Sequence, residues 1–304
     1  MATATGFLTR SLARIRLFTN EPTTSAKYDD DALIDLLENQ WAGILGEFNR
    51  VSQHPFVVRH NITFGEASRT YVLPPNVGAV MRLAKVDSTT NAVEWEVFPH
   101  SRNNPSGPGI TFEGNIIRLE PDWQGNDETL QVDYMPTGDV RLHAGVAGEI
   151  DNTTSTEFCT VVLEAEPTTH GVLDNRPNAY AGSVFRVLSA TENNYVQERI
   201  ISAYDVATRK VTLRPTFETA LLPGGATVAY EIAPLLWQAN DMIVPLAVAK
   251  VVAGIEGDTK RFNALGLQLA QEMRRLRLDA ASFDSIKGIT FEHDTVTNRR
   301  YIGW

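Results

Sequence analysis

The sequence predicts an α+β protein in which helices from both ends of the chain form one bundle, with two antiparallel β modules inserted into it. Apolar residues recur at helical spacing near both ends, whereas the middle has short runs of Val, Ile, Thr and aromatics between Gly, Pro, Asn and Asp. Neither terminal helix pair can bury its apolar stripe alone, so the simplest arrangement packs the two pairs together. The predicted parts are 1–55 with 234–284 (bundle), 56–143 (first β module), 144–233 (linker and second β module) and 285–304 (extended tail).

The first fifty residues indicate two helices. In the first, Leu8, Leu12 and Ile15 fall at i, i+4 and i+7. The second has a continuous apolar stripe, and residues 29–31 are three acids that suit the positive end of a helix. The members of that stripe are Leu33, Leu37, Trp41, Ile44 and Phe48.

Helical spacing returns after Pro234. In the first C-terminal helix we expect Pro245 in the opening turn and Asp241 as the cap. Gly257 and Asp258 separate it from a second helix. The apolar stripe of the second helix is Phe262, Leu265, Leu269, Met273, Leu276 and Ala280.

The middle of the chain has a strand-and-turn pattern. Residues 113–115 and 204–208 are typical of tight hairpin turns, and 144–156 read as a linker rich in Gly, Asn and Thr. The candidate strands are 56–64, 80–86, 93–98, 110–112, 116–119, 130–134, 157–164, 183–189, 195–203, 210–214 and 227–232.

Composition and charge narrow the class of partner. The chain has 304 residues, is 43% hydrophobic and 21% charged, and this excludes a disordered chain. No apolar run approaches the length that spans a bilayer, and a single cysteine fits synthesis in a reducing compartment. The net charge of −10 argues against DNA or an anionic membrane as a tight partner. Basic residues gather near both ends and form either solvated helix faces or contacts between subunits: Arg10, Arg14, Arg274, Arg275 and Arg277.

The residue patterns predict that the protein is not an enzyme and has no cofactor or metal. The six histidines lack metal-site spacing, and we expect His100 and His143 to be solvated in turns. Cys159 lies in a β-branched run, which favours a small core residue over a nucleophile. Acids at 29–31 and 122–128 suit a helix start and a polar loop, with calcium binding as the alternative. A glycosidase carboxylate pair stays open, because such a pair is set by distance in space.

Several segments resemble the head-to-tail adaptor proteins of tailed bacteriophages, also called connector or head-completion proteins. The N-terminal segments are GFLTRSLARI (6–15), YDDDALIDLL (28–37), and NITF (61–64) leading to YVLP (71–74). On the C-terminal side, GD (257–258) precedes a long helix with EMRRL (272–276). The stretch 157–233 is similar to an additional β module of phage virion proteins, through NAYAGSVF (178–185), IISAYD (200–205) and VTL (211–213).

This resemblance implies a structural virion protein, made in the host cytoplasm and placed in the neck. It would form a homo-oligomeric ring, usually of twelve copies, beneath the portal protein, with a tail or nozzle protein on the far side. Genome DNA would pass through the channel without sequence-specific binding, and no membrane would be involved. The C-terminal tail would dock on the portal or a neighbouring subunit, because its apolar residues have no helical period. The predicted docking residues are Ile286, Ile289, Phe291, Arg299, Arg300, Tyr301, Ile302 and Trp304.

The alternative is a receptor- or carbohydrate-binding virion protein that uses the β module. Aromatic side chains stack on sugar rings, and the candidates are Trp95, Trp123, Tyr180 and Tyr195. A binding protein of this kind is more often trimeric or monomeric, so oligomeric state separates the two hypotheses.

Overall fold

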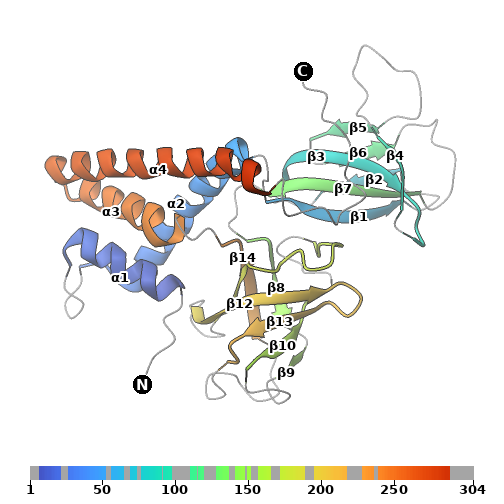
Figure 1. The fold of residues 1–304 in the computed structure, drawn as a ribbon, viewed down its shortest axis with the longest axis horizontal. Helices are drawn as coiled ribbons and strands as arrows, with labels where there is room; N and C mark the ends of the chain where they lie inside the picture. Colours follow the sequence, from blue (N-terminus) through green and yellow to red (C-terminus); the bar gives the residue numbers. More distant parts are fainter. Residues whose placement is uncertain are drawn as a thin grey trace, which may run out of the picture.

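The computed structural model describes most of the chain in segments. These are residues 7–21, 27–52, 56–64, 69–73, 77–90, 92–97, 110–114, 116–119, 128–136, 141–147, 149–151, 157–165, 172–188, 195–217, 228–235 and 239–287. Helices gather at one end of the molecule and sheets at the other (Figure 1).

The helices lie where the apolar periodicity predicts them. They are α1 (Phe7–Thr19), α2 (Asp30–Val51), α3 (Val244–Ile255) and α4 (Thr259–Lys287), with one π-helical turn, η2 (Ala239–Ile243), before α3. The Asp29 side chain caps α2 by accepting the backbone N–H of Ala32 at 2.8 Å. Gly257 has a φ of 72°, a left-handed conformation that glycine adopts without strain, and it separates α3 from α4.

The start of α3 is partly as predicted. Pro245 does lie in its first turn, where a missing backbone N–H costs no hydrogen bond. The predicted cap is wrong, however, because Asp241 lies inside η2 and α3 has no side-chain cap. Instead, the Asp241 carboxylate faces Arg10 and Arg14 of α1, at 3.9 and 3.7 Å.

The strands of the described segments form three antiparallel sheets. The first has the order β1-β7-β3-β4, with β1 (Val58–Phe64), β7 (Glu128–Pro136), β3 (Val77–Val86) and β4 (Val93–Glu96). A small second sheet has the order β2-β6-β5, with β2 (Thr70–Val72), β6 (Ile116–Leu119) and β5 (Ile110–Glu113).

The third sheet has the order β8-β14-β11-β12-β13-β10-β9. Its strands are β8 (His143–Ala147), β14 (Val228–Ala233), β11 (Val184–Leu188), β12 (Tyr195–Asp205), β13 (Lys210–Arg214), β10 (Cys159–Val162) and β9 (Glu149–Asp151). The hairpin turns predicted between β5 and β6 and between β12 and β13 are confirmed. The predicted linker at 144–156 is wrong in part, because β8 and β9 occupy much of it.

The two β regions share one core. A single cluster of buried side chains runs from Val58 on β1 to Ile232 on β14 and takes in both large sheets. Backbone hydrogen bonds cross between them: the N–H of Asn175 donates to the carbonyl of Arg59 at 3.0 Å. The β part is therefore one body with a continuous core.

The predicted architecture, a helical bundle with inserted β modules, is wrong. The protein is α+β, but it is not a helical bundle with β insertions, since helix and strand contribute about equally and the three sheets hold the larger core. The helices are organised by α3, which packs against α1, α2 and α4 and is buried on nearly every side. The stripes on α1 and α2 are thus covered by α3, together with η2 and Leu269, Met273 and Leu276 of α4. The start of α1 also contacts the third sheet, since the N–H of Leu8 donates to Glu198 on β12 at 2.8 Å.

Candidate protein-interaction surface

The predicted basic residues do not form one surface. Arg10 and Arg14 on α1 converge on Asp241 of the same chain, and Arg277 on α4 reaches Glu47 of α2 at 2.6 Å. These contacts hold helices of one molecule together, which the sequence reading did not anticipate. Each is partly exposed, so each contributes at most about 1 kcal/mol.

Arg274 and Arg275 remain on the outside of α4. Arg275 lies 3.5 Å from Glu272 one turn earlier and is 70% exposed, and Arg274 is exposed as well. Among the described residues, these two members of the predicted basic set reach no acid on another helix, whereas Arg10 and Arg277 are exposed but do.

The predicted docking tail lies almost wholly outside the described residues. Helix α4 continues to Lys287 and so includes Ile286, although no helical period was expected from residue 285 onward. The other docking residues fall beyond the described part: Ile289, Phe291, Arg299, Arg300, Tyr301, Ile302 and Trp304. Their docking role stays a prediction.

Helix α4 has two contrasting faces. Leu265 and Leu276 are buried against the other helices, and Leu269 is half-buried. On the opposite side, Leu267 is 71% exposed and Leu278 is 59% exposed. We call the exposed residues Lys260, Leu267, Arg274 and Leu278 the outer face of α4, because steps of seven, seven and four residues place them on one side.

Helix α2 also has an exposed face, and its character differs. We call Asp31, Asp35, Asn39, Gly43 and Gly46 the outer face of α2, since all five are exposed and recur at helical spacing. A Cβ added at Gly43 or Gly46 would meet nothing within 4 Å, so packing inside the chain does not require these glycines. Each costs about 1 kcal/mol of helix stability relative to alanine.

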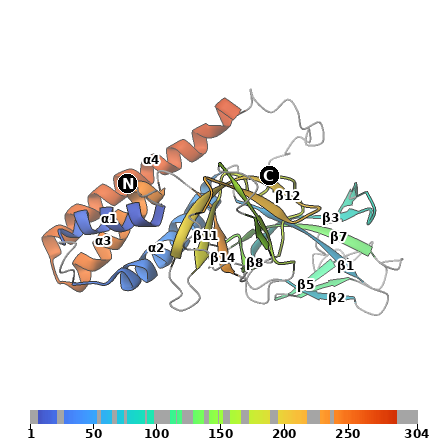
Figure 2. The ribbon, with the colours of Figure 1, turned by 90° about the horizontal axis from the view of Figure 1, so that it is seen from below.

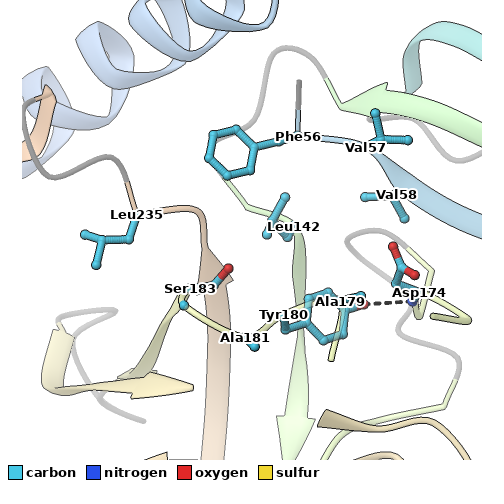
Figure 3. A pocket seen from close by; sticks show the side chains of 11 residues that line it. Phe56, Val57, Val58, Leu142, Asp174, Ala179, Tyr180, Ala181, Ser183 and Leu235 are labelled. Atoms are coloured by element: carbon cyan, nitrogen blue, oxygen red, sulfur yellow. Dashed lines mark hydrogen bonds between the residues drawn. The ribbon is translucent and has the colours of Figure 1, made fainter. Parts of the chain in front are cut away.

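A cavity of about 250 Å³ lies between β1, the start of β8 and the segment before β11. Figure 3 shows Phe56, Leu142 and Leu235 around it, with Tyr180 and Asp174 at its edge. The Asp174 carboxylate already accepts the backbone N–H of Arg59 at 2.9 Å and two guanidinium nitrogens of Arg176 at 3.0 and 2.7 Å. These bonds serve to fix the segment 174–183 against β1.

Tyr180 is unavailable for stacking on a sugar. Its ring is 1% exposed, and its hydroxyl accepts the backbone N–H of Asp174 at 2.8 Å, the dashed line in Figure 3. Burial holds the pKa of the Tyr180 phenol well above its usual value. The sequence reading of Tyr180 as a binding residue is wrong because its ring belongs to the shared β core. The side chains of Trp95, Trp123 and Tyr195 lie outside the described part.

His143 was expected to be solvated in a turn, and this is wrong. It begins β8, is fully buried, and its Nδ1 lies 3.0 Å from the hydroxyl of Tyr230. Burial lowers its pKa to about 3, so the ring is neutral near pH 7. His100 lies outside the described residues. Cys159 is buried in β10, which confirms it as a core residue.

A buried ionic network joins the helices to the third sheet. Arg186 on β11 donates to Glu198 at 2.7 Å and to Glu231 at 3.0 Å, and all three side chains are at most 5% exposed. Glu198 also accepts the N–H of Leu8 at the start of α1. Sequence reasoning missed this network, although Arg186 stands directly opposite both glutamates in the strand register.

Neither metal ligation nor membrane crossing is indicated in the described segments. No group of three or more His, Cys, Asp and Glu side chains there could hold a metal ion. None of the helices in this part of the chain combines the length and hydropathy that crossing a bilayer requires.

No protein-family model matches the sequence, and no curated protein is significantly similar to it. Function therefore has to be argued from the sequence and from the surfaces described above.

Proposed function

We propose that the protein is a structural virion protein that joins the portal of a tailed phage to its tail as a head-to-tail adaptor ring. The proposal starts from the sequence resemblance, which covers residues 6–140 and 234–284. It identifies an assembly protein whose partners are the portal, a tail or nozzle protein and further copies of this chain.

The observation that carries the proposal is the outer face of α4. Leu267 and Leu278 are large apolar side chains on a regular helix, and both are more than half exposed. Burying each such side chain would yield roughly 1.5–3 kcal/mol. The two leucines lie on one side of the helix with the basic residues Lys260 and Arg274, and this combination supports a protein partner that covers the outer face of α4.

The charge of the chain supports the same function. DNA must slide through an adaptor channel, so weak or repulsive contact with phosphate is preferable to tight binding. A chain of net charge −10 meets that requirement.

The experiment uses heads purified from a phage that carries a portal but lacks this gene product. Added protein is expected to bind at the portal vertex as a ring, visible by electron microscopy, and to restore tail joining in an infectivity assay. Heads that gain tails equally well without the protein would overturn the proposal, as would binding scattered over the capsid shell.

A further inference from the structure

The residues on the outer face of α4 indicate which chemical groups a partner surface must present. Its charged members, Lys260 and Arg274, are basic, and Leu267 and Leu278 protrude between and beyond them. The matching surface should therefore present carboxylates next to shallow, open positions that can receive a leucine side chain.

The outer face of α2 has this chemistry. Asp31 and Asp35 supply exposed carboxylates at its N-terminal end, and Gly43 and Gly46 leave open space further along. Glycines on an exposed helix face let another helix approach closely, which offsets their cost within the monomer.

The spacing of the two faces also agrees. Leu267 and Arg274 are seven residues apart on α4, and Asp35 and Gly43 are eight residues apart on the outer face of α2. If the two helices run antiparallel, Arg274 meets Asp35 while Leu267 lies over the open space at Gly43. Seven residues span about 10.5 Å and eight about 12 Å of an α-helix, a difference that a leucine side chain can bridge, so both contacts form at once. Leu278 then lies beside Asp31, in the first turn of α2.

We infer that a second copy of this chain covers the outer face of α4 with its own outer face of α2. The two faces belong to different helices, and in Figure 2 α4 follows the upper edge of the helical group while α2 follows the lower edge. A contact between two different faces is heterologous, so it adds copies head to tail and closes into a ring when the rotation permits. This inference rests on the proposed function and names the subunit contact within it.

Charge reversal tests the pairing. Arg274→Glu places a carboxylate opposite Asp35, and Asp35→Arg places a guanidinium opposite Arg274. Each variant alone is expected to lower occupancy on portal-bearing heads by about tenfold or more, because like charges juxtaposed in an interface oppose association. An equal mixture of the two variants restores it, since each reversed face then finds a complementary one.

Arg118→Glu is the matched control. Arg118 is 49% exposed and lies on the small second sheet, away from both helices, so its reversal changes the net charge by the same amount as Arg274→Glu without touching the pairing. Circular dichroism of all three variants reports whether each remains folded, and occupancy is read by quantitative gels of washed heads.

The outcomes separate the inference from the proposed function. Full rescue by the mixture supports the pairing of α4 with α2. If wild-type protein binds heads and Arg274→Glu binds as well as Arg118→Glu, the subunit contact is wrong while the adaptor function stands. If both reversals weaken binding but their mixture does not recover, the faces bind another virion protein and the inference also fails. Wild-type protein that neither binds heads nor self-associates overturns both.

Discussion

Replacing Arg186 with methionine should lower the free energy of unfolding more than a comparable substitution at the surface. Arg186 is the only positive charge whose hydrogen bonds hold both Glu198 and Glu231 in the described network, and its side chain is 5% exposed. Methionine keeps most of the side-chain volume but leaves the buried Glu198 carboxylate without its guanidinium partner and the buried Glu231 carboxylate with Arg141 at 3.9 Å. Removing one partner of a buried pair costs about 3–5 kcal/mol. We expect a loss of this size in the free energy of unfolding at pH 7.

The assay is urea denaturation followed by circular dichroism, with Arg118→Met as the matched control. Arg118 pairs with Glu113 at 3.1 Å in an exposed position, so its loss should cost no more than about 1 kcal/mol. Hydrogen exchange adds a local readout, since the Leu8 amide donates to Glu198 and should lose protection in Arg186→Met.

A rescue variant completes the test of the network. Combining Arg186→Met with Glu198→Gln and Glu231→Gln removes the stranded charges, so most of the lost stability should return. The reasoning is refuted if Arg186→Met costs no more than Arg118→Met, or if the triple variant is less stable than the single one.

Three further predictions concern the core, the backbone and the tail. His143 has a folded pKa of about 3 and an unfolded pKa of about 6.5, so between these values the unfolded chain binds more protons than the folded one. The stability contributed by neutral His143 is complete above pH 6.5, and roughly 3 kcal/mol of it is lost by pH 4.5. His143→Phe should remove this difference between urea denaturation above pH 6.5 and at pH 4.5. Gly145→Ala should destabilise by about 1–3 kcal/mol, because its Cβ would lie 3.1 Å from Glu164 Cβ and 2.5 Å from Glu164 Oε2, which the N–H of Val146 holds in place at 2.7 Å. Gly46→Ala should instead gain roughly 0.5–1 kcal/mol in the monomer, and equal melting temperatures would contradict this. Deleting residues 288–304 leaves α4 intact, so the protein should stay folded but bind portal-bearing heads at least about tenfold more weakly; wild-type occupancy would exclude the docking role.

The sequence by itself determined the local elements. The stripe of Leu33, Leu37 and Trp41 placed α2, and the spacing of Leu265, Leu269 and Leu276 placed α4, because helical periodicity depends on near neighbours only. The turns at 113–115 and 204–208 could also be predicted from local sequence, since turn residues act through their own backbone preferences. In α4, the same spacing placed Leu265 and Leu276 on the buried side, whereas Leu269 is only half-buried.

The tertiary structure alone decided what covers each element and which side chains are buried. Helix α3 took the central position among the helices because it is apolar on nearly every side, and this replaced the predicted bundle. From the sequence His143 was expected in a turn, but the pairing of β8 with β14 buries it. Arg186 lies opposite its two glutamates because of the register of β11 with β12 and β14. Contacts between residues so far apart along the chain depend on the register and packing of whole sheets. For that reason the faces left uncovered, on α4 and α2, could be identified only once the fold was known.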